Sequence, residues 1–439
     1  MQAWRDRIAA RTAVVGVIGQ GYVGLPLALV FYESGFRVRG FDIDAAKVAV
    51  LSRGESFIKH IGTERITAAV AAGRYAATTD FDRLRGCDAI FICVPTPLGA
   101  HREPDNSYIH DTARAIAKRL RRGQLVVLES TTYPGTTEGE VLPLLEESGL
   151  KCPDDFLLAF SPEREDPGRT DFNTRTTPKL VGGVNPLSTE IAADLYGACL
   201  ERVISLSHAR VAESAKLLEN IFRSVNIALV NELKMILERM GIDVWEVIRA
   251  AATKPFGFMP FYPGPGLGGH CIPLDPFYLS WKAAEHGEWA RFIELAGEIN
   301  SRMPRYVIEK LALALNSDRK AVNGSKVLVL GLAYKANVDD DRESPSYEIL
   351  ELLKEAGAQI DYCDPLFPAT HRTRRHDLGL RSVPCDAETF SKYDAVVVST
   401  AHDVFKKAEL YRGTKLVVDT RNLVAPLFPE GGGPRIVKA

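Results

Sequence analysis

A glycine-rich turn near the start of the chain constrains the fold more than any other stretch. Residues 13–18 (Ala-Val-Val-Gly-Val-Ile) have the pattern of a buried parallel strand and lead directly into residues 19–24, Gly-Gln-Gly-Tyr-Val-Gly. A helical pattern follows over residues 25–34, and a second strand, residues 38–41, ends at Asp42. A GxGxxG turn between a strand and a helix, with an acidic residue about twenty residues later, is typical of a doubly wound parallel sheet.

Each part of this turn has a physical role in binding a dinucleotide. Gly19 makes the turn, Gly21 lets a pyrophosphate approach the backbone, and Gly24 permits close packing of the helix. The helix N-terminus offers its amides and the positive end of its dipole to the phosphates. Asp42 would bind the adenosine ribose hydroxyls and repel a 2′-phosphate, which favours NAD over NADP. A purely structural turn is the alternative interpretation.

The strands that follow bring polar residues to one edge of the predicted sheet. Strand-like runs at residues 88–94 and 124–128 are followed by Thr96 and by Ser130 and Thr131. Ligands of open parallel sheets bind at the carboxyl ends of the strands, so these residues are expected to face the cofactor. The residues expected to bind it are Gly19, Gly21, Tyr22, Val23, Gly24, Asp42, Lys47, Thr96, Ser130 and Thr131.

Another strand-like run, residues 156–160, is followed by an unusually charged turn. Residues 161–168 read Ser-Pro-Glu-Arg-Glu-Asp-Pro-Gly. Turn formation explains the prolines and the glycine but does not require so many charges. Taken by itself, Glu163 also fits the pattern of a solvated surface carboxylate.

Residues 208–240 change to a helical period. Apolar residues recur every three or four positions, which predicts one amphipathic helix about 50 Å long. Such a helix can bridge two domains and present a face to a second subunit. Lys216 and Asn220 are four residues apart and share a face outside the apolar stripe. They are either solvated or directed into a cleft between domains.

Residues 263–276 form the most unusual stretch, Pro-Gly-Pro-Gly-Leu-Gly-Gly-His-Cys-Ile-Pro-Leu-Asp-Pro. Its glycines and prolines predict a tight, irregular loop that fixes the positions of Cys271 and Asp275. One interpretation is a structural turn in which the cysteine is a small buried residue. The other is a loop that holds a ligand.

A second α/β pattern begins at Lys326. The predicted strands are residues 327–331, 359–363, 395–399 and 416–419, and residues 346–356 are a predicted helix. This pattern lacks GxGxxG, and its polar strand ends include Lys335 and Arg421. The glycine-rich tail at residues 431–433 is expected to be mobile.

The predicted architecture is α/β, with two Rossmann-like doubly wound parallel-sheet domains joined by a long central helix. We expect a dinucleotide-binding domain at residues 1–206 and a central helical domain, which carries the cysteine loop and mediates dimerisation, at residues 207–305. The second Rossmann-like domain would occupy residues 306–439.

Composition and charge exclude several classes of protein. A net charge of −2 gives no electrostatic case for nucleic acid or an acidic membrane surface. The N-terminus leads into no secretory segment, and no apolar run approaches the length needed to cross a membrane. Seven scattered cysteines without CxxC spacing argue for reduced thiols in the cytoplasm and against a disulfide framework or zinc site.

Five motifs occur in order over nearly the full length: Gly19-Gln-Gly-Tyr-Val-Gly24, Ser161-Pro-Glu-Arg164, Lys216-x3-Asn220, Gly268-Gly-His-Cys271-x3-Asp275 and Gly331-Leu-Ala-Tyr-Lys335. Their order and spacing resemble the UDP-glucose/GDP-mannose dehydrogenase family. Within it, the stretches at residues 255–279 and 161–168 look most similar to bacterial UDP-N-acetylglucosamine 6-dehydrogenases, which supply uronic amino sugars for surface polysaccharides.

The resemblance implies a four-electron oxidation of a sugar C6 alcohol to the acid, with NAD and with a thiohemiacetal and a thioester on Cys271. Lys216 and Asn220 would hold the oxyanion and a water, and Glu163 would activate water for hydrolysis. Asp275 and Thr131 match members of the same hydrogen-bonded network. The implied substrate-binding residues are Glu163, Arg164, Lys216, Asn220, Phe261, Tyr262, Gly268, Lys335 and Arg421, with the UDP moiety on the C-terminal domain and a homodimer or larger homo-oligomer as the assembly.

One departure bears on the sugar. Some UDP-glucose-specific relatives carry a second glutamate four residues after the first, and here that position is Pro167. Glu165 or Asp166 would have to replace it, which weakens the case for glucose. UDP-linked N-acetylglucosamine, N-acetylgalactosamine, N-acetylmannosamine and glucose all stay open.

Two other classes remain as alternatives. A two-electron β-hydroxyacid-type dehydrogenase shares the N-terminal fold, the long helix and the Lys-x3-Asn pair, but needs neither Cys271 nor residues 326–424. A non-catalytic NAD-binding protein has no reason to carry Cys271, Lys216, Asn220 and Glu163 together.

Overall fold

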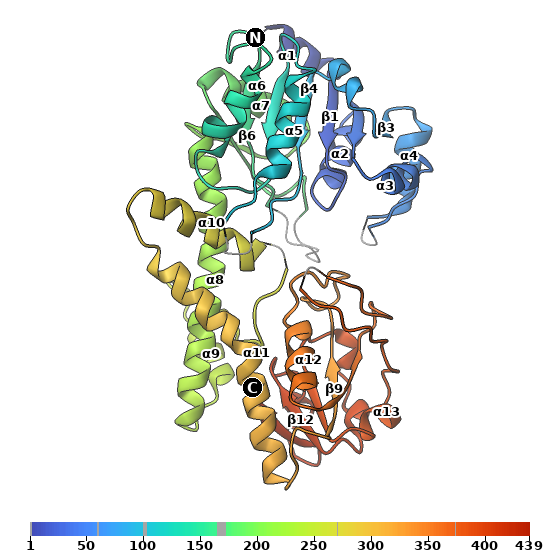
Figure 1. Ribbon diagram of the computed structural model, residues 1–439, viewed down its shortest axis with the longest axis vertical. Helices are drawn as coiled ribbons and strands as arrows, with labels where there is room; N and C mark the ends of the chain where they lie inside the picture. Colours follow the sequence, from blue (N-terminus) through green and yellow to red (C-terminus); the bar gives the residue numbers. More distant parts are fainter. Residues whose placement is uncertain (1, 59–60, 100–102, 165–172, 270, 374) are drawn as a thin grey trace. The chain divides into compact units, whose positions relative to one another are not determined.

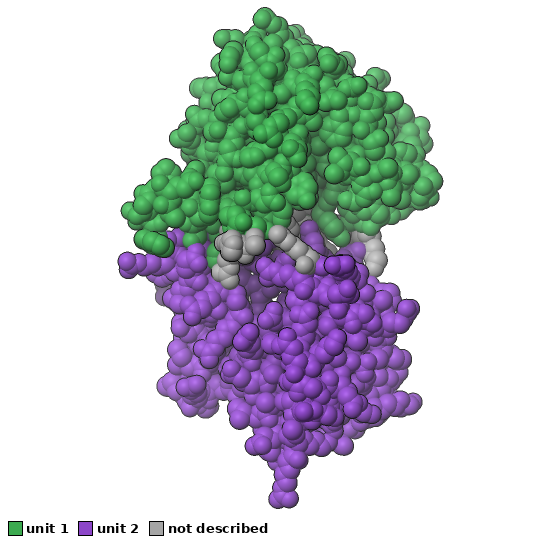
Figure 2. Space-filling view, in the orientation of Figure 1, with its two compact units in different colours: residues 1–219, 277–289 green, residues 220–276, 290–439 purple. Residues whose placement is uncertain are grey.

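The computed structural model describes residues 2–58, 61–99, 103–164, 173–269, 271–373 and 375–439. The chain divides into two compact units, which are coloured separately in Figure 2. The first unit contains residues 1–219 and 277–289, and the second contains residues 220–276 and 290–439. The three-domain division made from the sequence stays a prediction.

The first unit is built on a sheet with the strand order β3-β2-β1-β4-β5-β6-β7-β8. Figure 1 labels strands β1, β3, β4 and β6 of this sheet. Neighbouring strands are parallel except β6 and β7, which are antiparallel. The order reverses at β1, between β2 and β4, and open α/β sheets bind ligands at such a reversal. The strands are β1 (Val14–Ile18), β2 (Arg37–Phe41), β3 (Tyr75–Thr78), β4 (Ala89–Ile92), β5 (Leu125–Leu128), β6 (Leu157–Phe160), β7 (Lys179–Gly183) and β8 (Val203–Ser205).

Helices cover both faces of this sheet, because successive strand side chains point to opposite faces and both sets are apolar. One core packs Val15 and Val17 against α2, α4 and α7, and the other packs Ile90 and Ile92 against α5 and α6. The helical segments of this unit are α1 (Gln2–Ala9), α2 (Gly24–Glu33), α3 (Ala45–Ser52), α4 (Thr63–Ala71), η1 (Phe81–Gly86), α5 (Ser107–Ala117), η2 (Thr137–Val141), α6 (Leu142–Glu146) and α7 (Pro186–Gly197).

Helix α8 (Ala209–Arg239) confirms the long helix predicted over residues 208–240. Its residues up to Glu219 belong to the first unit and those from Asn220 to the second. Much of its apolar stripe is not buried within the chain, since Leu218 is 66% exposed and Leu229 is 49% exposed. No helix in the described ranges is long and apolar enough to cross a membrane.

The second unit is built on a smaller parallel sheet with the order β10-β9-β11-β12-β13. Helices α11 and α12 pack on one face, and α13, η3 and η4 pack on the other. Two doubly wound α/β sheets and a long central helix are therefore confirmed. Helix α10 (Cys271–Glu285) begins in this unit and continues from Phe277 in the first. The other segments are α9 (Val244–Ala251), α11 (Arg291–Ser317), β9 (Lys326–Leu330), α12 (Pro345–Glu355), β10 (Gln359–Cys363), α13 (Ala387–Ser391), β11 (Ala395–Val398), η3 (Asp403–Phe405), η4 (Ala408–Tyr411), β12 (Leu416–Asp419), η5 (Ala425–Leu427) and β13 (Arg435–Lys438).

Two regular segments were not predicted from the sequence. Helix α10 begins at Cys271, so the second half of the predicted loop at 263–276 is helical, with Pro276 inside the helix. The prolines masked this helix: the first turn of a helix tolerates Pro273, but Pro276 lies beyond that turn, where proline normally disfavours a helix. At the other end, the chain that follows residues 431–433 forms β13 against β12, and Ala439 is buried. The mobility expected of residues 431–433 themselves stays a prediction.

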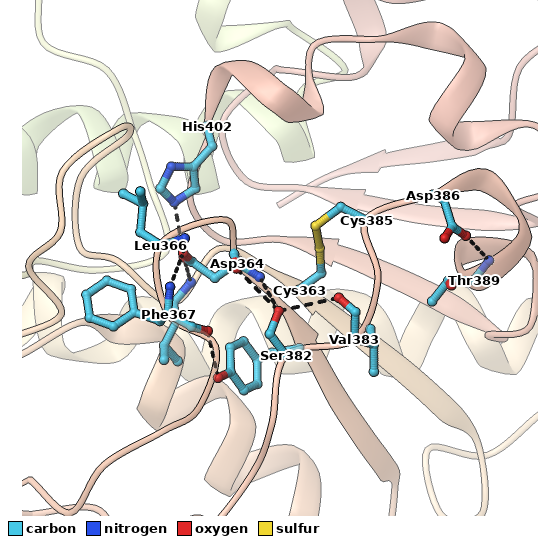
Figure 3. The surroundings of a disulfide bond; sticks show 12 residues. Cys363, Asp364, Leu366, Phe367, Ser382, Val383, Cys385, Asp386, Thr389 and His402 are labelled. Atoms are coloured by element: carbon cyan, nitrogen blue, oxygen red, sulfur yellow. Dashed lines mark hydrogen bonds and ion pairs between the residues drawn. A yellow bond between two sulfur atoms is a disulfide. The ribbon is translucent and has the colours of Figure 1, made fainter.

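Cys363 and Cys385 form a disulfide bond, with their Cα atoms 6.0 Å apart (Figure 3). The expectation that the cysteines are reduced is therefore wrong for this pair. The two cysteines meet because a parallel bridge between Tyr362 and Ser382 brings the end of β10 beside the segment that carries Cys385. They are 22 residues apart in the sequence, and this separation does not reveal the bridge. Cys87, Cys93, Cys152 and Cys199 are free.

We expect reduction of the Cys363–Cys385 bond to destabilise the second unit by about 2–4 kcal/mol, because the bond restricts the unfolded chain. Amide hydrogen exchange of residues 359–386, with and without a reductant, measures this change, and exchange should be faster on reduction. Cys385→Ser should exchange fast in both conditions. Cys152→Ser, which removes a free thiol of the first unit, is the control and should respond to the reductant as the unmodified protein does. If the unmodified protein exchanges at the same rate with and without the reductant, the prediction is contradicted.

Candidate active site

The turn after β1 has the geometry that a bound dinucleotide needs. Gly19 has a φ of +88°, and a Cβ atom on it would lie 2.4 Å from the carbonyl oxygen of Cys93. A Cβ atom on Gly24 would lie 1.9 Å from the carbonyl oxygen of Gly19. Around Gly21, in contrast, no atom beyond its chain neighbours lies within 4 Å of such a Cβ position. The backbone there is open to a pyrophosphate, so the turn fits the cofactor predicted from the sequence.

Asp42 follows β2 and orders this turn. Its Oδ2 accepts a hydrogen bond from the backbone N–H of Gln20 at 2.9 Å, and its Oδ1 accepts one from the N–H of Asp44 at 2.9 Å. The buried Gln20 side chain is itself held by the Tyr75 hydroxyl, which donates to it at 2.8 Å. Each carboxylate oxygen has two lone pairs, so Asp42 retains acceptors for ribose hydroxyls.

The ends of β4 and β5 are tied together. The Ser130 hydroxyl donates to the carbonyl oxygen of Val94 at 2.7 Å, which occupies it in holding the two strand ends. Thr96 is buried, and its carbonyl oxygen accepts a hydrogen bond from the Tyr278 hydroxyl of α10. Thr131 is partly exposed at the same edge.

The other predicted cofactor residues lie around the first turns of α2 and α3. Val23 is the residue before α2, and Tyr22 beside it is partly exposed. Lys47 lies in α3 with its ammonium 5.9 Å from the centroid of the Phe57 ring.

Cationic side chains hold the segment after β6. The ammonium of Lys216, on α8, donates to the carbonyl oxygen of Glu163 at 2.5 Å, and Lys216 is 3% exposed. The Arg164 guanidinium donates to both carboxylate oxygens of Glu219, at 2.6 and 3.3 Å. Lys216 is therefore not a solvated surface lysine, and its ammonium has further donors besides the one used here. Glu163 and Lys216, two predicted catalytic residues, lie together.

A pocket lies beside the glycine turn. It is lined by Val23, Pro26, Leu27, Glu129, Glu163, Arg164, Thr174, Thr177, Pro178 and Lys179. The charged lining residues that were not predicted from the sequence are Glu129 and Lys179. They form a buried ion pair with 2.6 Å between Nζ and Oε2. Burial raises the pKa of Glu129, although Lys179 and Tyr196 act in the opposite direction. The available signal was the position of Glu129, directly after the apolar run of β5.

In the second unit, Asn220 and Asp275 are hydrogen-bonded and buried. The Asn220 Nδ2 donates to the Asp275 Oδ2 at 2.6 Å, and the Arg223 guanidinium donates to the Asn220 Oδ1 at 3.0 Å. A guanidinium only donates and a carboxylate accepts, so these two partners fix the orientation of the amide. These two predicted catalytic residues therefore lie together as well.

The glycine loop that leads into α10 packs closely on its neighbours. A Cβ atom on Gly268 would lie 2.5 Å from the Cβ of Tyr334, and one on Gly264 would lie 2.4 Å from an Arg421 guanidinium nitrogen. The backbone N–H of Gly264 donates to the side chain of Asn231 at 3.0 Å. Asn231 was not predicted, although it lies about three turns after Asn220 on α8 and so shares its face. Burial lowers the pKa of Arg421 to about 10.

Other predicted residues are placed less fully. The side chain of Cys271 and residues 165–167 lie outside the described part of the chain, while the backbone of Cys271 begins α10. Lys335 is partly exposed after β9. Phe261 packs edge-to-face on Phe222 with ring centroids 5.6 Å apart, and Tyr262 is 50% exposed.

Uncommon backbone conformations gather after β9 and β12. Asn337, Glu343 and Asn422 have φ angles of +62°, +49° and +52°. Side chains other than glycine adopt such angles rarely, and they do so preferentially at ligand-binding positions. The carboxyl ends of this second sheet are therefore a candidate ligand site too.

Comparisons with known proteins match three segments of the chain to one family. Residues 13–200 match the NAD binding domain of the UDP-glucose/GDP-mannose dehydrogenase family, residues 210–302 its central domain, and residues 328–426 its UDP binding domain. NAD as the cofactor and a UDP-sugar as the class of substrate follow from these matches.

Individual relatives carry different sugar names. A UDP-N-acetyl-D-glucosamine 6-dehydrogenase from Pseudomonas aeruginosa is 36% identical over 89% of this chain and 91% of its own length. A UDP-N-acetyl-D-mannosamine dehydrogenase from Escherichia coli is also 36% identical, over 90% of this chain and 94% of its own. A solved UDP-D-ManNAc dehydrogenase from Pyrococcus horikoshii superposes with a TM-score of 0.85 and 33% identity, covering 97% of this chain and 99% of that one. The chain belongs to the UDP-glucose/GDP-mannose dehydrogenase family.

Proposed function

We propose that the protein oxidises UDP-N-acetylglucosamine at C6 to the uronic acid in two NAD-dependent steps through a thioester on Cys271. The observation that carries this proposal is the hydrogen bond from the Lys216 ammonium to the backbone carbonyl oxygen of Glu163. It brings the residue proposed to stabilise the oxyanion next to the residue proposed as the general base. The same chemistry on UDP-linked N-acetylgalactosamine, N-acetylmannosamine or glucose is the alternative. The two-electron β-hydroxyacid reaction is disfavoured by the UDP binding domain.

The protein's own residues would divide the chemistry as follows. The turn at residues 19–24 and Asp42 would hold NAD, which would supply the hydride acceptor for both oxidations. The Cys271 thiolate adds to the C6 aldehyde, because the thiolate is the nucleophilic form of a cysteine. Lys216 and Asn220 donate to the oxyanion. Glu163 removes a proton from the water that cleaves the thioester, so the cysteine leaves as thiolate and the sugar as carboxylate.

A cytoplasmic location and a role in surface polysaccharide synthesis are parts of the same proposal. They are supported by the family resemblance and by a 35% identical relative, protein CapL of Staphylococcus aureus.

The mechanism is tested by stoichiometry. Each nucleotide sugar consumed should yield two NADH without free aldehyde. Cys271→Ser should stop after the first oxidation, because an alkoxide forms far less readily than a thiolate near neutral pH. Glu163→Gln should complete both oxidations but slow hydrolysis by roughly a hundred- to ten-thousand-fold, so that intact mass reveals an adduct on Cys271. One NADH per sugar, or a fully active Cys271→Ser, would overturn the proposal.

The choice of sugar is tested by a panel of UDP- and GDP-sugars with NADH formation as the readout. We expect the highest kcat/KM for UDP-N-acetylglucosamine. A clear preference for another UDP-sugar would replace the substrate and leave the mechanism intact, whereas inactivity with every sugar would favour a non-catalytic NAD-binding role.

Asp42 should determine the preference for NAD over NADP. A hydrogen bond to a charged group contributes about 1.5–3 kcal/mol, so Asp42→Ala should lower kcat/KM with NAD roughly 10- to 150-fold and relax the discrimination against NADP. Asp80→Ala, which removes an exposed cap of η1, is the control. Equal use of both cofactors by the unmodified enzyme would refute the assignment.

We also propose a homodimer or larger homo-oligomer formed through the exposed apolar face of α8. The support is the exposure of the α8 residues Val211, Leu218, Phe222, Leu229, Leu233 and Ile236. Leu229→Glu should shift the sedimentation of the protein to that of a monomer, because a charge in an apolar interface is costly. Glu232→Ala on an exposed α8 position should not. A fully active monomeric unmodified protein would contradict the proposal.

A further inference from the structure

The ion pair between Glu129 and Lys179 is unusual for its surroundings. The side chain of Glu129 is 0% exposed and that of Lys179 is 8% exposed. Both charges have left water, and a buried ion pair seldom stabilises a fold more than apolar residues of the same size would. Stability alone therefore does not account for its presence at the wall of a pocket shared with the glycine turn.

The direction of β7 puts Lys179 at the ligand-binding edge of the sheet. Lys179 is the first residue of β7, and the first residue of a parallel strand would lie at the opposite edge. Because β7 is antiparallel to β6, its start lies beside the carboxyl end of β6. Ala159 is opposite Gly183 and Phe160 opposite Gly182, so the same register continued by three residues puts Glu163 opposite Lys179.

The Lys179 ammonium joins three elements. It donates to the Glu129 carboxylate after β5 at 2.6 Å and to the carbonyl oxygen of Pro162 after β6 at 3.0 Å. It also lies 5.3 Å from the centroid of the Tyr196 ring, whose hydroxyl donates to the other Glu129 oxygen. The Lys179 ammonium, both Glu129 carboxylate oxygens and the Tyr196 hydroxyl are thus all hydrogen-bonded. A buried polar network in which each group has a partner favours a single geometry.

Two lysines thus hold two successive carbonyl groups of one short segment. Lys179 binds the carbonyl of Pro162, and Lys216 binds the carbonyl of the next residue, Glu163. The Arg164 guanidinium anchors the following residue through Glu219 and the carbonyl oxygen of Pro178. Such anchoring of the backbone limits where the Glu163 carboxylate can lie.

We propose that Lys179, fixed by Glu129, is a positioning residue that holds the Pro162–Glu163 backbone so that the Glu163 carboxylate reaches the water that hydrolyses the thioester. The inference rests on the proposed function, because it assigns Lys179 to the hydrolytic step alone. Loss of Lys179 should leave both oxidations fast and slow only the last step. A displacement of about 1 Å at a reacting group costs on the order of a hundredfold.

Lys179→Met tests this directly. We expect a burst of two NADH per active site, then turnover slowed roughly a hundredfold, with an adduct on Cys271 in the intact mass. If hydrolysis becomes rate-limiting, kcat and KM for the nucleotide sugar fall together and kcat/KM stays nearly constant. A merely structural lysine would instead reduce the folded fraction, which lowers kcat at unchanged KM. Lys179→Arg keeps the cation and should restore most of the hydrolysis rate.

The double variant Lys179→Met with Glu129→Gln separates positioning from stability. Removing both charges leaves no unpaired carboxylate, so this variant should fold where the single variant is too unstable. The inference holds if the double variant still accumulates the adduct, and it is overturned if stability and hydrolysis recover together. Arg7→Met, which breaks a 2.7 Å ion pair with Asp88 before β4, at the opposite edge of the sheet, should form no adduct.

Glu163→Gln distinguishes failure of this inference from failure of the proposed function. If Glu163→Gln accumulates the adduct while Lys179→Met turns over normally, the positioning role alone is wrong. If Glu163→Gln hydrolyses the thioester at the normal rate, the general-base role is wrong and the inference falls with it.

Discussion

The loop before α10 contacts its neighbours so closely that side chains cannot be accommodated at its key positions. A Cβ atom added to Gly264 would contact the Arg421 side chain, and one added to Gly268 would contact Tyr334. A Cβ atom on Gly266 would lie 3.0 Å from the Cβ of Pro345. At Gly268 the neighbour is the Cβ atom of Tyr334, so a side chain there would force the backbone to shift, and Gly266 has a φ of +139° that favours glycine. Close packing and the hydrogen bonds from the Gly264 and Gly269 N–H groups, to Asn231 and to the carbonyl oxygen of Arg342, together hold residues 264–269 of this loop.

The two sheets have the same reversal of strand order but use their first acidic residue differently. Asp42 follows β2 and keeps free lone pairs beside the glycine turn. Asp364, which follows β10, accepts backbone hydrogen bonds from Leu332 and Ala333 at 2.6 and 3.0 Å and lies 3.1 Å from the buried His402 ring. Burial opposes ionisation of Asp364, but these hydrogen bonds lower its pKa. The Asp364 carboxylate is therefore engaged by groups of the fold itself, including a histidine ring, whereas Asp42 accepts hydrogen bonds from two backbone N–H groups.

Local patterns predicted the fold, and long-range pairing limited the prediction. The turn at residues 19–24 and the α8 helix were predictable because glycine chemistry and apolar period act over short spans. β13 was missed because its partner β12 supplies the stability that its own four residues lack. The Cys363–Cys385 pair depends on a lateral bridge that spacing does not encode. In the candidate site, Glu163, Lys216, Asn220 and Asp275 could be predicted from sequence motifs. Glu129, Lys179 and Asn231, which contact the same segments, belong to no motif and were missed.

The two units immobilise their functional groups by opposite means, and the chemistry of each explains why. In the second unit, the loop before α10 uses glycines, because a backbone without side chains packs closely on its neighbours and loses no rotamer freedom. In the first unit, the ammonium groups of Lys179 and Lys216 hold the Ser161–Arg164 segment. This segment continues β6 past the end of its strand pairing, so its carbonyl groups need other hydrogen-bond donors. Because β7 is antiparallel to β6, although parallel to β8, its first residue, Lys179, lies beside the carboxyl end of β6. The reversed direction of β7 is therefore what lets an ammonium group on its first residue donate to a carbonyl group after β6.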